Sequence, residues 1–243
     1  MAVCYVYMTK QPYYEVNKYH NNRSFFFTVL DNCIISSTIQ ENKLWEPHMH
    51  RLFEKYVTKD SIVVECGAHI GTHTLKLALL ANHVYAFEPM PSTNKVLHRN
   101  LLLNTTGNVT IFQEGVSDAS GSTTFRWIPF GNPGASCLDN NPMVLPSNLP
   151  SVETIHVPLR TIDSLNLDRL DFMKIDVEGY ESLVIKGAMN TIRKHRPVIV
   201  MEVWSNLHTD TSIEHTRYKY RELLSIGYNV SHVEGPDYLF TPM

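Results

Sequence analysis

The sequence has no excess of basic residues. Its 21 lysines and arginines face 24 aspartates and glutamates, which gives a formal net charge of -3. A protein that neutralises the phosphates of a nucleic acid needs a basic surface. We therefore expect no nucleic-acid partner.

Paired cysteines, a secretory leader and long apolar runs are also lacking. The four cysteines are Cys4, Cys33, Cys66 and Cys137, and no two of them form a CxxC pair. This scatter favours reduced thiols over a disulfide framework. The first ten residues have no basic lead followed by an apolar core, and no apolar run approaches the ~20 residues of a membrane span. These absences predict a cytoplasmic protein that makes no membrane contact.

What is present suits one large α/β domain. The chain has 243 residues, of which 43% are hydrophobic. From residue 61 onward, short runs rich in β-branched and aromatic residues alternate with amphipathic runs. The strands are expected at 62–64, 84–87, 109–112, 172–175 and 198–201, and the helices at 92–104, 180–192 and 213–226. This alternation predicts a mostly parallel sheet with helices on both faces.

Two regions interrupt the alternation. Residues 1–58 are rich in tyrosine and phenylalanine and contain an expected helix near 45–56, so we predict an N-terminal addition packed on a main domain at 59–243. Residues 127–150 are crowded with proline, asparagine and glycine, which is typical of a long loop. Because long loops in compact domains are often functional, this segment is a candidate substrate lid.

A carboxylate stands on or beside the end of every expected strand. In an open parallel sheet, ligands bind outside the carboxyl ends of the strands. A row of acids at that edge favours a cationic or hydroxyl-rich ligand over a phosphorylated one. The five residues are Glu65, Glu88, Glu114, Asp176 and Glu202.

The first expected strand leads into a glycine-containing turn. Gly67 and Gly71 bracket it, and Glu88 follows seventeen residues later, where a carboxylate can accept both ribose hydroxyls of a nucleoside. A dinucleotide fingerprint would have a middle glycine where this sequence has Ala68 and His69. Glu65 would stabilise the ammonium and sulfonium groups of S-adenosylmethionine, whereas a pyrophosphate would gain nothing from it. The alternative is that Glu65 and Glu88 only cap neighbouring helices.

Several motifs in series resemble the FkbM family of S-adenosylmethionine-dependent methyltransferases. They are ECGAHIGTHT at 65–74, VYAFEP at 84–89, NLLLN at 100–104, GVSD at 115–118 and KIDVEGYE at 174–181. The usual family pattern has Asp and Asn where this sequence has Glu65 and His69. The resemblance covers roughly residues 60 to 203. It implies a Rossmann-like class I methyltransferase fold and, most often, transfer of the methyl group to a hydroxyl.

The resemblance also implies the cofactor contacts. Glu65, Gly67, Ala68 and Gly71 would line the methionine end, Glu88 the ribose, and the segment from Glu114 to Val116 the adenine. Thr74, Pro89 and Asp176 complete the expected set.

The last motif supplies the candidate catalytic groups. Methyl transfer to an alcohol needs the hydroxyl held in line with the sulfur–methyl bond and a group that takes its proton. Asp176 and Glu178 are best placed, Glu202 is a third candidate, and His208 is a reserve base. The same acids could instead hold a divalent cation such as Mg²⁺ that binds the acceptor hydroxyl. No metal ligands are assigned.

The sequence thus predicts an O-methyltransferase acting on a hydroxyl of a sugar, glycan or other polar metabolite. Two alternatives remain: a nicotinamide-dependent reductase on a similar sheet, and a non-catalytic domain that binds S-adenosylmethionine. The expected partner is a small-molecule or glycan acceptor, and a homodimer is an open alternative to a monomer.

Overall fold

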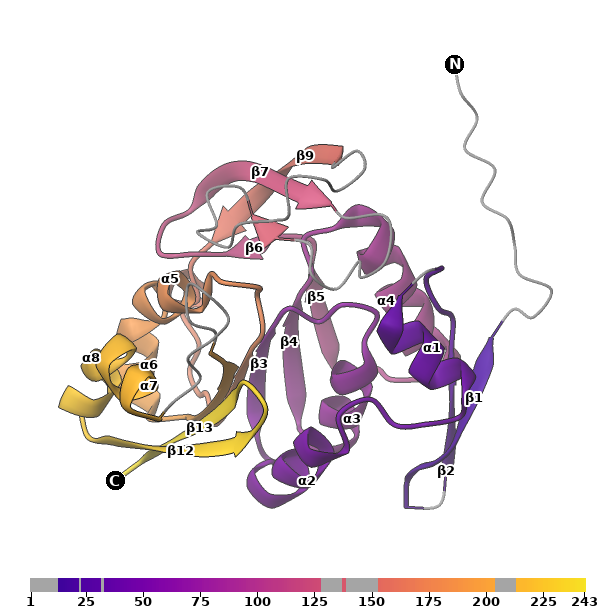
Figure 1. Cartoon of the computed structure of the whole chain (residues 1–243), viewed down its shortest axis with the longest axis horizontal. Helices are drawn as coiled ribbons and strands as arrows, with labels where there is room; N and C mark the ends of the chain where they lie inside the picture. Colours follow the sequence, from indigo (N-terminus) through magenta and orange to yellow (C-terminus); the bar gives the residue numbers. More distant parts are fainter. Residues whose placement is uncertain (1–12, 22, 32, 128–136, 139–152, 204–212) are drawn as a thin grey trace.

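A computed structural model describes residues 13–21, 23–31, 33–127, 137–138, 153–203 and 213–243 (Figure 1). Its largest feature is a seven-stranded sheet in the order β12-β13-β11-β10-β3-β4-β5. β3 (Ile62–Cys66), β4 (His83–Phe87), β5 (Val109–Phe112), β10 (Phe172–Ile175) and β11 (Val198–Glu202) are mutually parallel. β13 (Asp237–Pro242) runs antiparallel to both β11 and β12 (Tyr228–Glu234). The five strands expected from the sequence are confirmed, whereas the terminal hairpin β12–β13 was missed.

The chain reverses its direction across the sheet between β3 and β10. From β3 it proceeds through β4 to β5, and after β10 it proceeds through β11 on the opposite side. Ligands of open α/β sheets bind at such a switch point, outside the carboxyl ends of the strands. A ligand site is therefore expected at the turns that follow Cys66 and Ile175.

Helices cover both faces of the sheet, and side chains alternate between two cores. Val63, Phe172 and Val200 belong to one core, which also holds residues of α2 (Pro47–Tyr56), α3 (Thr72–Leu80) and α4 (Pro91–Leu103). Their strand neighbours Val64 and Met173 belong to the other core, with residues of α5 (Glu181–Gly187), α6 (Met189–His195) and α8 (Arg221–Ser225). Strands buried on both faces account for the continuous apolar runs in the sequence.

Two expected helices are each divided in the structure. The run 180–192 forms α5 and α6 with a break at Ala188, where the absent side chain of Gly187 admits the carbonyl oxygen of Ser117. The run 213–226 forms α7 (Ile213–Lys219) and α8, separated by Tyr220. The helix expected at 92–104 is confirmed as α4, which begins one residue earlier, at Pro91, and has Met90 as its N-cap.

The segment before β3 consists of a β-hairpin and two helices. β1 (Tyr14–His20) pairs with β2 (Arg23–Phe27), and α1 (Ile34–Gln40) and α2 follow. The hairpin lies beside α4 (Figure 1). The side chain of Asn104, the C-cap of α4, accepts a hydrogen bond from the N–H of Phe26 at 3.0 Å and donates one to the carbonyl of Phe26 at 2.7 Å. The side chain of Asn100 bonds the N–H and the carbonyl of Thr28 in the same way. These two asparagines act as a clamp that joins the N-terminal segment to the main sheet.

A second, smaller sheet follows β5. It contains β6 (Gly115–Val116), β9 (Glu153–Arg160), β7 (Gly121–Trp127) and β8 (Cys137–Leu138), in that order. The lid expected at 127–150 begins at the end of β7, includes β8, and otherwise lies outside the described residues. The lid therefore stays a prediction. In the part of the chain that the structure describes, no helix is long and apolar enough to cross a membrane.

Candidate active site

The turn after β3 carries the two glycines, and its geometry requires both. Gly67 has a φ of +85°, and a Cβ built on it would lie 1.7 Å from the carbonyl oxygen of Asp176. Gly71 has a φ of +90°, and its Cβ would lie 2.6 Å from the Leu97 side chain of α4. The positive φ disfavours a larger residue at both positions, and at Gly67 the Asp176 backbone also leaves no space for one. The first glycine therefore brings the turns after β3 and β10 into direct contact.

The backbone of this turn is not free to bind a phosphate. The N–H groups of Gly67 and Ala68 both donate to the carbonyl of Phe87, at 3.1 and 2.9 Å. A phosphate-binding loop needs such N–H groups to be unpaired. This geometry agrees with the sequence-based preference against a dinucleotide.

Glu65 is a fully buried acid that lacks a hydrogen-bond partner. It is 0% exposed, and neither carboxylate oxygen makes a hydrogen bond. The nearby Thr74 hydroxyl is also buried without a partner. Burial raises the pKa of Glu65 to about 7, although the charge of Lys174 opposes the shift. Since an unsatisfied buried carboxylate is costly, this arrangement calls for a ligand that carries donors or positive charge.

Glu88, at the end of β4, is also buried but is held in place. One oxygen accepts the N–H of His69 at 2.9 Å and the other accepts the N–H of Met90 at 2.9 Å. Burial raises the pKa of this carboxyl to about 7, against the effect of these two bonds. A carboxylate has about four acceptor sites, so two remain for ribose hydroxyls.

His69 is a second group without a partner at the same turn. Its φ is +48°, and both ring nitrogens are buried and make no hydrogen bond. Burial lowers its pKa to about 4, so the ring is neutral near pH 7. The sequence indicated this residue only as a departure from the family pattern.

The remaining expected cofactor residues lie farther along the same edge. Glu114 follows β5 and is paired with Arg160 of β9 through both its oxygens, one of them at 3.0 Å from Nη2. Val116 is buried in β6, and Pro89 is half-buried directly after Glu88. The pairing with Arg160 was not predicted. It joins Glu114 to β9, so Glu114 belongs to the side of the site that the smaller sheet forms.

Lys174 lies beneath the turn after β10. Its ammonium donates to Asp176 at 3.0 Å and to the carbonyl of Gly67 at 3.4 Å. Burial alone would lower the pKa of Lys174, but Asp176, Glu65 and Glu46 outweigh it and hold the pKa above its ordinary value. The lysine is therefore charged, and it orients Asp176.

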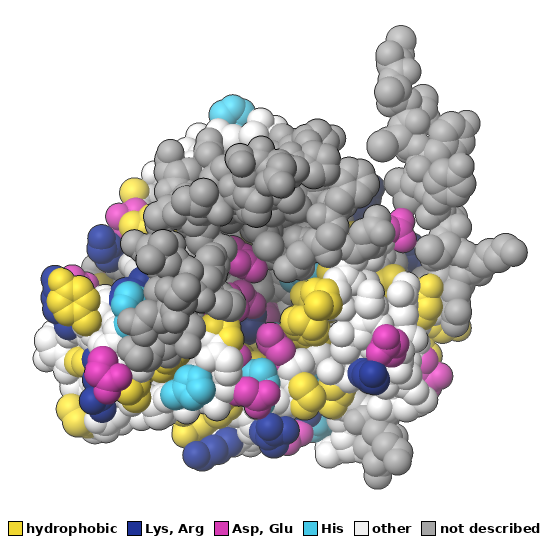
Figure 2. Space-filling view, in the orientation of Figure 1, with side chains coloured by type: hydrophobic (Ala, Val, Ile, Leu, Met, Phe, Trp, Pro, Cys, Tyr) yellow, Lys and Arg dark blue, Asp and Glu magenta, His cyan; other side chains and the backbone are white. Residues whose placement is uncertain are grey.

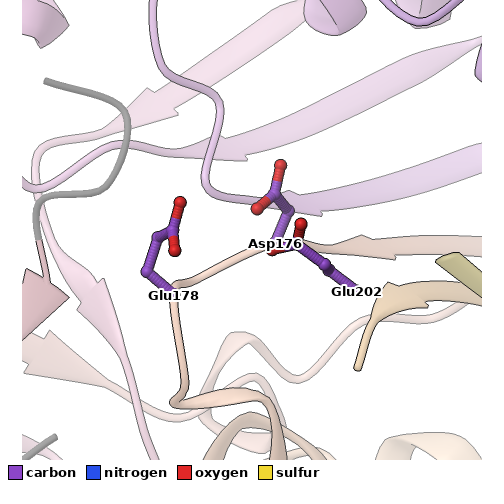
Figure 3. A group of neighbouring side chains, drawn as sticks. All are labelled: Asp176, Glu178 and Glu202. Carbon is purple, nitrogen blue, oxygen red and sulfur yellow. The ribbon is translucent and has the colours of Figure 1, made fainter. Parts of the chain in front are cut away.

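Asp176, Glu178 and Glu202 converge, as the sequence predicted. One carboxylate oxygen of each lies within 4.8 Å of the others. Figure 3 shows the Asp176 and Glu178 side chains pointing the same way from one turn, with Glu202 reaching toward Asp176 from β11. Glu178 has a φ of +53°, and burial together with Asp176 raises its pKa to about 8. The buried carboxylate of Glu181 stabilises this strained turn by accepting the N–H of Gly179 at 2.9 Å.

Three further residues at this edge were missed by sequence reasoning. Glu46, the N-cap of α2, has a φ of +45° and lies 3.4 Å from Nε2 of His73. His48 contacts Asp237 at 2.7 Å, and Asp237 is opposite Glu202 in the β11–β13 ladder. These residues are distant in sequence and have no motif, so only the fold brings them together. His208, the reserve base, lies outside the described residues.

A family model decides the affiliation of the chain. The model described as "Methyltransferase FkbM domain" matches residues 65–228, which is more than half of the sequence. The chain belongs to the FkbM methyltransferase family. This confirms the resemblance found in the motifs and does not support the nicotinamide-dependent reductase.

Two curated relatives extend the comparison. The chain is 28% identical over 155 residues to the hexuronic acid methyltransferase AglP of Haloferax volcanii, covering 64% of this chain and 61% of that protein. It is 29% identical over 146 residues to methyltransferase 1 of Beauveria bassiana, covering 53% and 58% respectively. The chain thus spans about three fifths of the length of these relatives.

A solved structure agrees with the fold. The methyltransferase FkbM from Methylobacillus flagellatus superposes with a TM-score of 0.50 and 19% sequence identity, covering 79% of this chain and 50% of that one. With the strand order described above, this confirms the class I methyltransferase architecture that the motifs implied.

Proposed function

We propose that the protein is an S-adenosylmethionine-dependent O-methyltransferase that acts on a hydroxyl of a sugar, glycan or other polar metabolite. The observation that carries the proposal is the Glu65 carboxylate, which is fully buried at the switch point and makes no hydrogen bond. A ligand that brings an ammonium group would satisfy it, and S-adenosylmethionine has one.

The residues present fit this cofactor along the edge of the sheet. Glu65 would hold the ammonium group, with the Thr74 hydroxyl as a further buried polar contact. Glu88 would accept the ribose hydroxyls with the acceptor sites that its two backbone bonds leave open. When bound, the cofactor supplies a methyl group on a positively charged sulfur, which the surrounding acids stabilise electrostatically.

Residues of the turn after β10 would orient the acceptor and take up its proton. Asp176 is fixed by Lys174, so its free oxygen could orient an acceptor hydroxyl and take up the proton of that hydroxyl. Glu178, with a pKa of about 8, and Glu202 lie within reach of the same proton. Because three acids converge, the proton can be held on any one of them.

A divalent cation on these three carboxylates is the second candidate arrangement. Three oxygen ligands at one point could hold Mg²⁺ if water or the acceptor completed the coordination. Methyl transfer measured after treatment with EDTA, and again after Mg²⁺ is restored, distinguishes this arrangement from a metal-free base.

The sugar acceptor is supported by the hexuronic acid methyltransferase among the relatives. The proposal is tested by calorimetry with S-adenosylhomocysteine, followed by transfer of labelled methyl groups to pooled mono- and oligosaccharides. We expect cofactor binding in the micromolar range and transfer that Asp176→Asn reduces by about 10²-fold or more. Absence of S-adenosylhomocysteine binding would refute the proposal.

A further inference from the structure

The acceptor half of the site contains an acid that the family domain does not supply. The family match begins at residue 65, whereas Glu46 belongs to the segment that precedes it. Its carboxylate is 31% exposed. Two residues farther on, His48 contacts Asp237 at 2.7 Å, and Asp237 is opposite Glu202 in the β11–β13 ladder. Glu46 therefore reaches the same edge of the sheet as the proposed catalytic acids.

The backbone explains how Glu46 is directed there. A left-handed conformation is unfavourable for glutamate, and Pro47 fixes the first turn of α2 directly after it. A carboxylate oxygen of Glu46 lies 3.4 Å from Nε2 of His73 in α3, which places it on the side of the glycine turn. Residues kept in such strained conformations cluster at functional sites.

The charges around Glu46 are predominantly negative. Asp176 and Asp237 raise its pKa to about 8, together with burial, which is the largest cause. In the described part of the chain, the cation that opposes this shift is Lys174, and its ammonium is already bonded to Asp176. In the space-filling view, acidic side chains gather near the middle of the face (Figure 2).

Buried groups without partners at the same edge indicate that a ligand completes it. Both oxygens of Glu65 and both ring nitrogens of His69 are buried without hydrogen bonds, and the charge of Asp176 acts on both residues. An anionic acceptor placed beside these acids would be repelled, whereas hydroxyl and amine donors would be stabilised.

We infer that Glu46 is an acceptor-binding residue of the transferase site and that, with Asp176 and Glu202, it selects uncharged or amine-bearing acceptors against anionic ones. The inference rests on the proposed function and adds the charge class of the substrate. The inferred preference against anionic acceptors differs from the acceptor in the name of one relative, a hexuronic acid methyltransferase.

The test uses three pools of acceptors with matched hydroxyl patterns: D-glucosamine and its oligomers, N-acetyl-D-glucosamine and its oligomers, and D-glucuronate and its oligomers. Labelled methyl transfer is measured for the full chain, for Glu46→Gln, and for the control Glu41→Gln. Glu41 lies in the same N-terminal segment, but it is exposed and pairs only with Lys43, at 2.7 Å. The assays are run at pH 9, above the pKa of about 8 of the Glu46 carboxyl, so that the glutamine keeps the size and hydrogen-bonding capacity of Glu46 and removes its charge.

For the unaltered protein we expect a higher kcat/KM with the amine-bearing or neutral pool than with the uronate pool. Glu46→Gln should raise the acceptor KM about five- to tenfold, reduce the preference over uronate by a similar factor, and leave the dissociation constant of S-adenosylhomocysteine unchanged. Glu41→Gln should behave as the unaltered protein.

Preference for the uronate pool, or transfer to none of the pools while S-adenosylhomocysteine still binds, would overturn the inference. So would a Glu46→Gln variant that matches the control. Uronate transfer that depends on added Mg²⁺ would also overturn it, in favour of a cation that bridges the acids and the acceptor. Loss of S-adenosylhomocysteine binding by the unaltered protein would instead refute the proposed function.

Discussion

The two halves of the candidate site are built in different ways. The cofactor half uses two consecutive strands and the turns after them, and its acids, Glu65 and Glu88, are buried. The acceptor half joins Asp176 and Glu202 to Glu46 and Asp237, which lie near opposite ends of the chain, and most of its acids are partly exposed. The comparison teaches that the proposed cofactor half is encoded locally, whereas the proposed acceptor half depends on how distant segments pack.

Gly67→Ala should break both halves together, and we expect it to have the largest effect. A methyl group at φ +85° would meet the Asp176 carbonyl at 1.7 Å, so the turns after β3 and β10 would have to separate. We expect a loss of about 3 kcal/mol or more in the free energy of unfolding in urea, together with loss of S-adenosylhomocysteine binding. The control Gly121→Ala, where no atom lies within 4 Å, should stay within about 0.5 kcal/mol of the parent. Equal stability of the two variants would contradict this description of the turn.

Glu65→Gln should separate function from stability in the cofactor half. We expect S-adenosylmethionine to bind about 10²-fold more weakly, because the buried partner of its ammonium is lost. The folded pKa of about 7 lies above the unfolded value, so ionisation of Glu65 costs stability as pH rises from about 4.5 through 7. The unliganded variant should therefore be more stable than the parent by roughly 1–3 kcal/mol at pH 8 and similar to it near pH 4. Exposed Glu222→Gln serves as the control, and unchanged cofactor affinity in Glu65→Gln would count against the assignment.

The pH dependence of S-adenosylmethionine binding tests the role of Glu65 in the same half of the site. Below pH 7 the Glu65 carboxyl is increasingly protonated, so binding of a cationic ligand must release a proton. The association constant for S-adenosylmethionine should fall by up to tenfold per pH unit below about 7. Calorimetry in buffers of different ionisation enthalpy measures the released proton directly. A flat profile in the parent protein, or an equal slope in Glu65→Gln, would exclude Glu65 as its source.

Substitutions that remove the contact between His48 and Asp237 should have the smallest effect on stability, and this effect should be confined to the acceptor half. A double-mutant cycle with His48→Asn and Asp237→Asn is expected to show a coupling of about 1 kcal/mol in urea unfolding, because both side chains are largely buried. The exposed pair of Glu41 and Lys43 should give a coupling close to zero. Cofactor affinity should not change in any of these variants. A change in that affinity would show that the two halves are not independent.

The contrast between the halves also explains what could be predicted from the sequence. The strands at 109–112 and 172–175 were located because apolar runs of that length fit a sheet buried on both faces. The glycine turn was located because its two glycines directly follow the first expected strand. The convergence of Asp176, Glu178 and Glu202 followed from the parallel arrangement of β10 and β11.

Other features depended on contacts that no local pattern contains. The break at Ala188 arises where Gly187 meets the Ser117 carbonyl, although the apolar periodicity continues through it. The position of Asp237 opposite Glu202 depends on the antiparallel insertion of β13, which the sequence did not indicate. Glu46 could have been noticed only as an acid directly before a proline, which is a weak signal for a helix start.

The asparagine clamp on β2 has a consequence for assembly. A strand with a free edge offers unpaired peptide groups to any extended segment of another molecule. Asn100 and Asn104 present amide groups to Phe26 and Thr28 much as an adjoining strand would, so this edge is already occupied by side chains. At Phe26 and Thr28 the clamp therefore leaves no backbone group for another strand to pair with, and the backbone of α4 stays intact.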